Sequence, residues 1–378
     1  MQTRSADVVI IGAGVAGLSA ARALADSGCL RVIVVEMERS YGLGSTSRAL
    51  GVLKRVLSTE TLSRMADESA RDLPTLADPC GADLLCEAPG MLTLASSPQE
   101  LAKLVSDRDA SARAGVSSCL LGPDEVAGRW PFIDPRGLRA GLFSPDDPGV
   151  DPHVLSTGLF RAAREGGVEF TFNTRVTGFL RDGRGGIDGV VTTSGDIRAA
   201  AVVNAAGPWA AGLCTEAGLA RRPPLDPRRR QIWQVAPGLS IPHDIPLVID
   251  ADARFYIRPL RDLFLLSLME EDEIPLLDNE PPFDWEQIFL IEDRASPRIP
   301  LLAQASVARG WAGWRTLTPD DAPVLGRVEA VPGLFMAAGF GGHGLALAPS
   351  SGRMVAGEIL GDVTCSALLS PFRIERFV

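Results

Sequence analysis

The sequence predicts an α/β protein in which helices cover a largely parallel β-sheet. Residues 7–11 and 31–36 are short, apolar, β-branched runs, typical of strands that are buried on both faces. Between them, residues 15–24 carry apolar side chains at helical spacing, and Gly28 is placed to end the helix. This order of strand, helix and strand predicts a βαβ unit with a right-handed crossover.

Composition bounds the size of the fold and the class of partner. With 378 residues, 46% of them hydrophobic, the chain is long enough for two domains or for one large α/β domain with an insertion. Its formal net charge of −10 argues against nucleic acid or an anionic membrane as the main partner. An anionic small molecule stays possible, because a local arginine cluster can outweigh the global charge.

Cysteine usage and hydropathy bound the compartment. The six cysteines are scattered, with no CxxC pair and no histidine at ligand spacing, so we expect free thiols in a reducing compartment and no metal site. No apolar run reaches the ~18 residues that a membrane span needs. Residues 8–18 are apolar but lack the basic start and the cleavage site of a signal peptide. We therefore expect a cytoplasmic protein with no integral membrane segment.

The segment "GAGVAG" places Gly12, Gly14 and Gly17 between the first strand and the helix. The first glycine permits a tight turn, and the second lets the backbone approach a pyrophosphate. The third lets the helix pack closely against the strand. In this position between a strand and a helix, the motif predicts a dinucleotide-binding site.

The residues around this motif support the same prediction. The helix begins at Val15 and Ala16, where free N–H groups and the positive end of the helix dipole suit phosphates. Glu36 ends the next strand at the ~20-residue offset of an acid that binds ribose hydroxyls. Arg39 follows shortly afterwards and suits the adenosine side, or is a solvated surface residue.

The motif alone does not distinguish FAD from NAD. The chain has one GxGxxG and no CxxxxC redox pair, which argues against a disulfide reductase with two dinucleotides. In "YGLGSTSRALGVLKR", Gly42 and Gly44 allow a tight loop. Ser45, Thr46 and Ser47 offer hydroxyl groups to a phosphate or to the edge of a flavin ring. An ordinary capped helix start would explain the hydroxyl groups, but it explains the glycines less well.

The rest of the chain alternates between two patterns. Strand patterns at residues 169–172, 176–181, 187–192 and 201–204 are separated by the hairpin signals "DGRGG" and "SGD". The blocks around "GMLTLA" and around "RFYIRPLRDLFLLSLME" mix strands with Pro-rich turns and charged helices. We interpret these two blocks as one discontinuous second domain. Near the end, "GLFMAA" predicts a strand, and a glycine loop then leads into a helix from Leu345.

The chain resembles the D-amino-acid-oxidase-like flavoproteins, which include glycine oxidase, sarcosine oxidase and dehydrogenase, and the catalytic subunit of L-proline dehydrogenase. The residues that carry the resemblance are, in order, "GAGVAG", Glu36, "GSTSR", "VVNAAGPWA", "GWRTLTPDDAPVLGR" and "GFGGHGLALAPSSG". The tail "SPFRIERF" is similar to the closing segment of the sarcosine/proline branch. The resemblance spans nearly the whole chain, so it is far more specific than any single motif.

This resemblance implies two domains and a tightly bound FAD. A Rossmann-type FAD-binding domain would comprise residues 1–80, 148–226 and 311–378. A discontinuous substrate domain, residues 81–147 and 227–310, would be built on a mixed β-sheet covered by helices. Some sarcosine oxidases hold the flavin through a cysteine close to the "PD" segment, whereas "GWRTLTPDD" contains none. We therefore expect FAD to be non-covalent.

The resemblance also assigns cofactor contacts. Val176 would contact the adenine side through its backbone, and Arg48 would lie near the isoalloxazine ring. The second glycine loop would bring backbone N–H groups to the ring, and the helix after it would point its positive end at the pyrimidine edge, which favours the anionic reduced flavin. The predicted cofactor-binding residues are Gly12, Gly14, Val15, Ala16, Gly17, Glu36, Arg39, Gly44, Ser45, Thr46, Arg48, Val176, Ala206, Gly207, Trp209, Gly341, Gly342, His343, Gly344 and Leu345.

Amine oxidation defines which substrate-binding groups to expect. A hydride equivalent leaves the α-carbon for flavin N5, and since the neutral amine reacts, no dedicated general base is obligatory. A carboxylate clamp is needed instead, and Arg315 in "GWR" is the best candidate because a guanidinium can hold a carboxylate bidentately. An ion pair of Arg315 with Asp320 or Asp321 is the alternative. The resemblance implies a substrate contact for Tyr256, whose alternative is packing within the sheet.

Three further polar residues are candidates for the same pocket. Arg230 matches a substrate-facing arginine of some D-amino-acid dehydrogenases, or belongs to a solvated charge run. Lys54 falls where sarcosine oxidases carry a second carboxylate-binding arginine. His343 contacts flavin or substrate, or caps the following helix. Three aromatic residues either wall the pocket or pack in the core: Trp233, Trp314 and Phe340.

These observations predict an FAD-dependent oxidoreductase that oxidises the C–N bond of a small amino or imino acid to an imine, which hydrolyses to an oxo acid. The electron acceptor would be a quinone, an electron-transfer protein or O2. Monomeric sarcosine oxidases activate oxygen with a lysine over the flavin, and neither Lys54 nor Lys103 matches its position, which favours a dehydrogenase. Two other classes stay open, namely a flavin-binding electron-relay subunit of a larger complex and a flavin monooxygenase. The GD-type motif that monooxygenases usually carry is absent.

Overall fold

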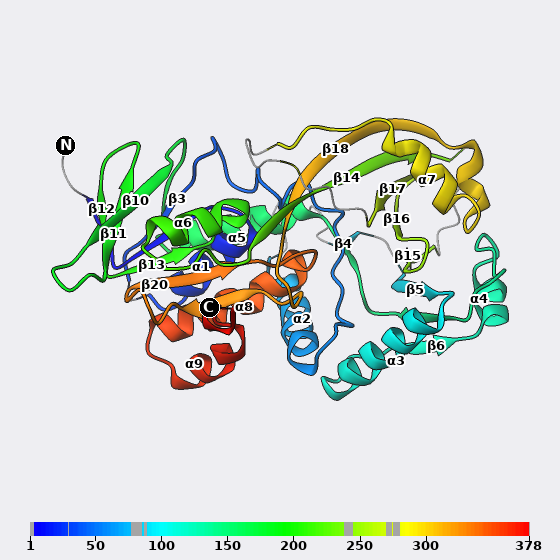
Figure 1. Ribbon diagram of the computed structural model, residues 1–378, viewed down its shortest axis with the longest axis horizontal. Coiled ribbons are helices and arrows are strands. Elements are labelled where there is room, and N and C mark those ends of the chain that lie inside the picture. The colour runs from blue at the N-terminus through cyan, green and yellow to red at the C-terminus, as the bar shows by residue number, and fades with distance from the viewer. Residues whose placement is uncertain are drawn as a thin grey trace.

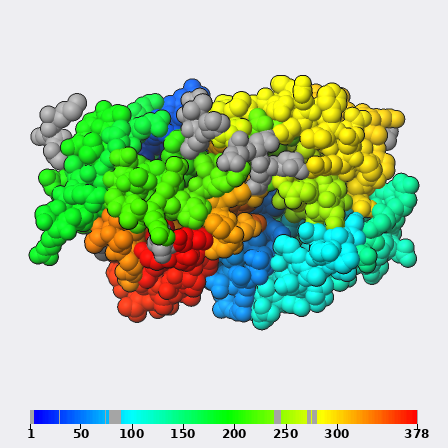
Figure 2. Space-filling view, in the orientation of Figure 1, coloured from blue at the N-terminus to red at the C-terminus, as the bar shows by residue number. Residues whose placement is uncertain are grey.

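The computed structural model describes residues 4–28, 30–76, 85–86, 89–237, 245–269, 274 and 280–377. In this part of the chain, a six-stranded and an eight-stranded sheet form the two halves of an elongated molecule, and a four-stranded sheet lies at the outer end of the first half (Figure 1). In the space-filling view, the green and red segments lie in one half of the molecule, and the cyan and yellow segments lie in the other (Figure 2). The predicted α/β class is confirmed.

The six-stranded sheet has the order β19-β20-β13-β2-β3-β9. Its members are β2 (Val8–Ile11), β3 (Val32–Val35), β9 (Glu169–Thr171), β13 (Ala201–Asn204), β19 (Val324–Arg327) and β20 (Leu334–Ala338). All neighbours are parallel except β19 and β20. The strands predicted in "VVII", "VIVV" and "AVVN" are therefore confirmed as the centre of this sheet, where every residue is buried.

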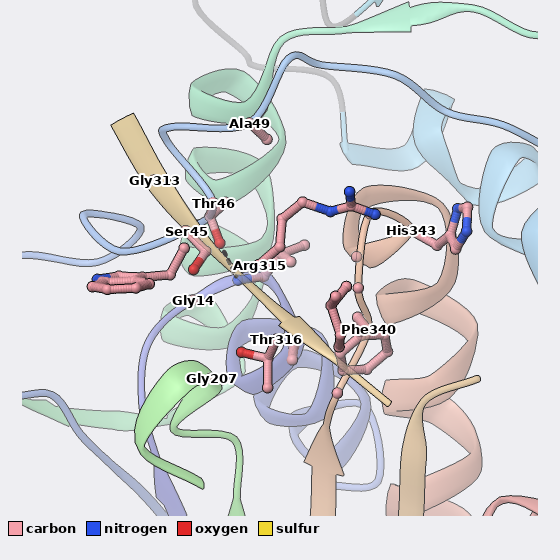
Figure 3. Close-up of a pocket in the computed structure, with 18 of the residues that line it drawn as sticks. Gly14, Ser45, Thr46, Ala49, Gly207, Gly313, Arg315, Thr316, Phe340 and His343 are labelled. Atoms are coloured by element: carbon pink, nitrogen blue, oxygen red, sulfur yellow. Dashed lines mark hydrogen bonds between the residues drawn. The ribbon is translucent and has the colours of Figure 1, made fainter. Parts of the chain in front are cut away.

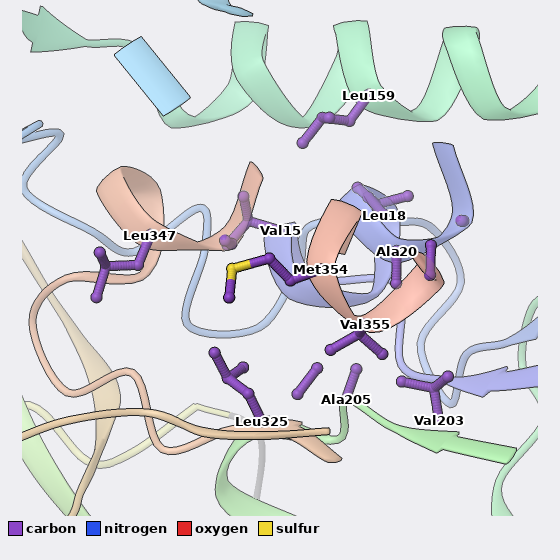
Figure 4. Close-up of a cluster of buried hydrophobic side chains, with 14 of the residues drawn as sticks. Val15, Leu18, Ala20, Leu159, Val203, Ala205, Leu325, Leu347, Met354 and Val355 are labelled. Carbon is purple, nitrogen blue, oxygen red and sulfur yellow. The ribbon is translucent and has the colours of Figure 1, made fainter. Parts of the chain in front are cut away.

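One face of this sheet carries four helices. They are α1 (Val15–Ala25), α2 (Glu60–Asp72), α5 (Pro152–Glu165) and α8 (Gly344–Ile359). Side chains of α1, α5 and α8 pack together over Val203 of β13 and over Ala205, the residue after this strand (Figure 4). A Cβ atom at Gly352 of α8 would lie 2.5 Å from the carbonyl carbon of Ser19, so the two central helices touch backbone to backbone. The helix predicted from residue 15 and the helix predicted near residue 345 are thus neighbours in space.

The opposite face packs against the four-stranded sheet, of order β1-β12-β11-β10, and against α6 (Ala210–Glu216). The strands are β1 (Arg4–Ser5), β10 (Val176–Arg181), β11 (Ile187–Thr192) and β12 (Ile197–Arg198). The hairpin predicted at "DGRGG" is confirmed, because β10 and β11 pair antiparallel across it. Alternate residues of β2 and β3 thus point into two different cores, which explains why both strands are apolar throughout.

The eight-stranded sheet has the order β18-β14-β17-β16-β15-β5-β7-β6. Its members are β5 (Met91–Ala95), β6 (Cys119–Leu121), β7 (Ala140–Ser144), β14 (Asp226–Ala236), β15 (Leu247–Asp250), β16 (Phe255–Leu260), β17 (Leu263–Leu268) and β18 (Ser306–Leu317). It is mixed, because β15 and β5 are parallel whereas its other neighbours are antiparallel. The remaining α-helices and strands of the described residues are α3 (Pro98–Arg113), α4 (Pro123–Arg129), α7 (Gln287–Ala295), α9 (Val363–Leu369), β4 (Leu85–Cys86) and β8 (Gly149–Val150).

Two long strands join the halves. β14 and β18 pair antiparallel along almost their whole length and arch across the molecule from one half to the other (Figure 1). This pairing places Arg228 opposite Arg315, and Arg230 opposite Gly313. The predicted division into two domains stays a prediction: β18 runs through its boundary at 310/311, and the boundary at 80/81 lies outside the described residues.

No helix in the part of the chain that the structure describes is both long and apolar enough to cross a membrane. Within the same ranges, no group of three or more His, Cys, Asp or Glu side chains is arranged to hold a metal ion.

Candidate active site

A cavity of about 880 Å³ lies between the two main sheets. It extends from the N-terminus of α1, past residues 44–54, to the strands β14, β16 and β18 and the glycine loop before α8. Its volume falls in the upper part of the range, about 300–1,000 Å³, of small-molecule and cofactor sites.

The first glycine motif shapes one end of this cavity. Gly12 has φ +99°, and a Cβ atom there would lie 2.6 Å from the carbonyl oxygen of Ala205 at the end of β13. At Gly17 a Cβ atom would lie 1.9 Å from the carbonyl oxygen of Gly12. Any larger residue there would therefore keep the helix from packing this closely against the loop. The N–H of Val15 donates a hydrogen bond of 2.9 Å to Oγ1 of Thr46, which closes residues 44–48 over the helix N-terminus (Figure 3).

Glu36 lies at the cavity wall directly after β3. Its carboxylate accepts N–H groups from Ala13 at 2.6 Å and from Glu38 at 2.9 Å. Burial raises the pKa of Glu36, although these backbone hydrogen bonds act in the opposite direction. The carboxylate therefore holds the glycine loop in place, and its predicted contact with a ribose stays a prediction.

The segment after Glu36 brings polar groups to the middle of the cavity. Arg48 lies with its Cβ against β18, where only a glycine fits, since a Cβ atom at Gly313 would lie 2.7 Å from it. The indole N–H of Trp311 donates to the carbonyl of Arg48 at 3.3 Å, and the Arg48 guanidinium donates to the carbonyl of Leu43. This segment is thus fastened to β18 through Arg48, and Ser45 and Thr46 also line the cavity.

Three cations from separate parts of the chain act on Tyr256 of β16. The guanidinium carbon of Arg230 lies 5.5 Å from the centre of the Tyr256 ring. Burial acts to raise the pKa of Tyr256, but the charges of Arg230, Arg315 and Lys54 outweigh it and hold that pKa below its ordinary value. Four of the five residues predicted to contact substrate are therefore brought together, from β14, β16, β18 and the segment after Gly51, at one wall of the cavity.

The guanidinium of Arg315 packs against the second glycine loop, residues 339–344. A Cβ atom at Gly342 would lie 2.5 Å from Nη2 of Arg315 and 3.1 Å from its Cζ, so the guanidinium rests directly on this glycine. The N–H of Gly341 donates to the carbonyl of Thr316 at 2.9 Å and ties the loop to β18. Figure 3 shows the Arg315 side chain running along this loop toward His343.

His343 contacts an acid that the sequence suggested only as a partner of Arg315. Its Nε2 lies 3.5 Å from Oδ2 of Asp321, a residue with the left-handed φ of 55°. Desolvation acts to raise the pKa of Asp321, but the hydrogen bond from His343 and the charges of His343, Arg315 and Lys54 lower it. Asp320 pairs with Arg376 instead, at 2.7 Å. The adjacent acids in "TPDD" were visible in the sequence, but which of them faces the cavity depends on the turn before β19.

Most predicted site residues line this one cavity, but Gly17, Arg39, Ser47 and Trp233 do not. Gly17 serves the close packing of α1 described above. Trp314 and Phe340 line the cavity, whereas Trp233 is fully buried in the core, with its ring 5.3 Å from that of Phe283. The predicted residues in the wall are Gly12, Gly14, Val15, Ala16, Glu36, Gly44, Ser45, Thr46, Arg48, Lys54, Val176, Ala206, Gly207, Trp209, Arg230, Tyr256, Arg315, Gly341, Gly342, His343, Gly344 and Leu345.

The α3 side of the wall was not predicted. Lys103 and Asp107 lie there, with Nζ of Lys103 2.7 Å from Oδ2 of Asp107, and Glu100 lies one turn before them. A helix that is amphipathic by sequence shows no sign of which polar residues will face a cavity. Only the packing of α3 beside β5 and β7 places them there.

The donor set fits a long dinucleotide with a flat ring at its far end. The α1 N-terminus and the close-packed Gly12 turn suit a pyrophosphate, since backbone N–H groups and the helix dipole both favour anions there. The α8 N-terminus begins at Gly344 in the same cavity and lies beside that of α1, because a Cβ atom at Gly344 would lie 3.8 Å from Cγ1 of Val15. No side chain caps its N–H groups. Two neighbouring helix N-termini at one cavity thus offer backbone N–H groups to one bound cofactor.

Comparisons with known proteins agree with this fit. Residues 7–358 match the profile of the DAO family, described as FAD dependent oxidoreductase. L-proline dehydrogenase from P. horikoshii has a similar structure, with a TM-score of 0.89 at 27% identity over 100% of this chain and 98% of that one. FAD-dependent oxidoreductase domain-containing protein 1 of Bos taurus is 29% identical over 98% of this chain and 84% of its own length.

A third relative is longer. The 4-methylaminobutanoate oxidase (formaldehyde-forming) of Paenarthrobacter nicotinovorans is 26% identical over 92% of this chain, which spans 43% of that protein. The family profile covers nearly the whole chain, including both glycine loops and Arg315. The chain therefore belongs to the DAO family of FAD-dependent oxidoreductases, and FAD is its cofactor.

Proposed function

We propose that this protein oxidises the C–N bond of a small amino or imino acid to an imine, which water then hydrolyses to an oxo acid. The observation that carries the proposal is the close contact of the Arg315 guanidinium with Gly342, at the same cavity wall as Arg230, Lys54 and Tyr256. A cationic wall next to the second glycine loop suits a substrate that carries a carboxylate beside its amine.

Each side chain has a role in this proposal. Arg315 holds the carboxylate bidentately, and Lys54 adds a second positive charge. Tyr256 offers its hydroxyl group, and Arg230, beside its ring, completes the positive field. Together they hold the substrate so that its α-carbon has a fixed position, which lowers the entropic part of the activation barrier. Bound FAD supplies the chemistry by accepting the two electrons and the hydrogen that leave the α-carbon.

The relatives support the substrate class. L-proline and 4-methylaminobutanoate, named for two of the similar proteins, both carry a carboxylate and a secondary amine. FAD is proposed to be non-covalent, since no cysteine is found among the described residues of the cavity wall. A quinone, an electron-transfer protein or O2 would take the electrons onward. We favour a dehydrogenase because both lysines lie in the first third of the chain, where neither matches the lysine with which monomeric sarcosine oxidases activate oxygen.

Anaerobic mixing of the holoprotein with a substrate panel tests the proposal. Glycine, sarcosine, L-proline, D-proline and a set of D-amino acids are added in turn, and at least one is expected to bleach the flavin absorbance. Arg315→Ala should lower kcat/KM for that substrate by about 10²–10³-fold, the loss of two charge-assisted hydrogen bonds. Arg309→Ala is the matched control, because Arg309 is on the same strand but outside the cavity wall.

Two results would contradict the proposal. The first is a flavin that no member of the panel reduces, above all if a stable partner protein co-purifies, which would favour the electron-relay subunit. The second is an Arg315→Ala variant as active as Arg309→Ala. Rapid reoxidation of the reduced holoprotein by air would overturn the preference for a dehydrogenase.

A further inference from the structure

Lys54 is carried by an irregular segment, residues 51–57, that lies against both halves of the molecule. Three apolar residues of this segment are buried. Leu53 and Leu57 belong to the core under α1, and Val56 belongs to a separate cluster beside α3. Two hydrogen bonds tie the segment to residues 148–150, from Leu53 N–H to the Pro148 carbonyl and from Val150 N–H to the Gly51 carbonyl. A shift of one residue would expose these apolar side chains, so the register of Lys54 is set by packing.

The residue after Lys54 is held by a buried ion network. The N–H of Arg55 donates to Oδ2 of Asp147 at 3.2 Å, and its side-chain Nε donates to Oδ1 at 3.0 Å. One carboxylate therefore binds both the backbone and the side chain of the same residue. Nη1 of Arg55 also donates to Asp67 of α2 at 3.0 Å. The exposed side-chain fractions are 12% for Arg55, 1% for Asp147 and 8% for Asp67.

The charges in this network extend to Lys54. Burial acts to lower the pKa of Arg55, but the hydrogen bonds that it donates to Asp147 and Asp67, together with the charges of these two carboxylates, raise it. Burial raises the pKa of Asp147, while the hydrogen bonds and charge of Arg55 and the charge of Lys54 act in the opposite direction. Asp147 thus interacts with Lys54 as well as with Arg55. A buried pair of this kind is strongly disturbed when one partner is removed, because the other is left as an unpaired buried charge.

We propose that Asp147 is a positioning residue for substrate binding, which fixes the backbone at Arg55 and thereby aims Lys54 into the cavity. This inference rests on the proposed function, in which Lys54 meets the substrate carboxylate. Asp147 lies outside the cavity wall, so it acts through its neighbours in the chain and not by touching substrate. A cation on a flexible stem gains selectivity when the start of that stem is held, because less rotational freedom is lost on binding.

The chain offers a close control beside Asp147. Asp146 also approaches Arg55, with Oδ2 3.6 Å from Nη2, but its side chain is 66% exposed. An exposed pair at that distance contributes little. Asp146→Asn and Asp147→Asn therefore remove the same charge from adjacent residues, and only the second removes the buried contact.

Binding of a non-oxidisable ligand separates positioning from general stability. Pyrrole-2-carboxylate and its neutral counterpart pyrrole-2-carboxamide are titrated into the holoprotein, and the Kd is read from the change in the flavin spectrum. Variants are Lys54→Met, Asp147→Asn, the double variant and Asp146→Asn, each measured with its FAD content and Tm. Arg55→Lys, which keeps the charge but loses the two-pronged contact, replaces Asp147→Asn should that variant not fold.

The expected pattern is specific. Lys54→Met should raise the Kd for pyrrole-2-carboxylate about tenfold or more and should change the Kd for the carboxamide little. Asp147→Asn should raise the Kd for pyrrole-2-carboxylate several-fold. The double variant should bind this ligand no more weakly than Lys54→Met alone. Asp146→Asn should bind as the wild type does.

Failures of the two proposals are distinguishable. If Lys54→Met leaves carboxylate binding unchanged, or if the wild type does not prefer the carboxylate, the role of Lys54 in the proposed function is wrong and this inference falls with it. If Lys54→Met weakens binding but Asp147→Asn does not, the positioning role alone is wrong. It is equally wrong if the two effects add in the double variant, or if Asp147→Asn weakens both ligands alike.

Discussion

Replacement of Gly342 by alanine should disable Arg315 without touching it directly. A Cβ atom at position 342 would lie 2.5 Å from Nη2 of Arg315, whereas ordinary contacts begin at 3.4 Å, so the guanidinium must move by about 0.9 Å. The backbone of Gly342 does not have a positive φ, so alanine is not strained there. The substitution should therefore act through the displaced side chain.

The size of the effect follows from this displacement. A misplacement of about 1 Å in a group that holds the substrate costs about 10²-fold in rate. We therefore expect kcat/KM to fall about 100-fold, or about 2.7 kcal/mol of transition-state stabilisation. The assay is anaerobic flavin reduction by the best substrate of the panel, with FAD content measured on the same preparation.

A double variant decides whether Arg315 is the route of the effect. In an Arg315→Ala background the guanidinium is gone, so adding Gly342→Ala should change kcat/KM less than about twofold. Two outcomes would refute the reasoning. One is a Gly342→Ala enzyme within threefold of the wild type. The other is a 100-fold loss that persists in the Arg315→Ala background, which would point to a clash with the cofactor instead.

Three further predictions follow from the same structure. Gly12→Ala, with φ +99° and a contact of 2.6 Å to the Ala205 carbonyl, should cost at least about 2 kcal/mol of stability and lower the flavin content per protein. Gly352→Ala should separate α8 from α1 and lower the free energy of unfolding by about 1–3 kcal/mol, whereas Gly128→Ala in α4, with open space around it, should not destabilise; denaturant unfolding compares the two. Tyr256 should titrate below the ordinary pKa of a tyrosine, as read from phenolate absorbance in a chain with two tyrosines, and Lys54→Met should raise that pKa. Because the folded state then binds fewer protons than the unfolded state, Tyr256 should add stability as pH rises from its lowered pKa toward about 10, and a flat profile in that window would contradict this.

The local elements were predictable because their signals are local. A buried parallel strand needs an apolar run, and a phosphate-binding turn needs glycine at fixed spacing, so residues 7–36 could be interpreted without a structure. The second loop was predicted from glycines followed by an apolar helix, and it begins α8 at Gly344, one residue before the expected start. The hairpin at "DGRGG" is a further local signal.

The partners within the site were not predictable in this way. Asp321 faces His343 while Asp320 binds Arg376, although the two acids are adjacent and chemically alike. Trp233 and Trp314 are similar in sequence context, yet one lies in the core and the other in the cavity wall. The α3 residues and the network around Arg55 gave no sequence signal at all.

By itself, the sequence determined the βαβ unit, the two glycine loops and the place of Glu36 after the second strand, since each depends on residue type and spacing within a short stretch. It also indicated the family, through motifs spread over nearly the whole chain. Only the tertiary structure decided that Arg315 rests on Gly342 and that Asp147 holds Arg55 beside Lys54. The physical reason is the same for both contacts. They join segments far apart in the chain, and their geometry is set by how β18, α8 and the segment at residues 51–57 pack as whole elements, which no local pattern encodes.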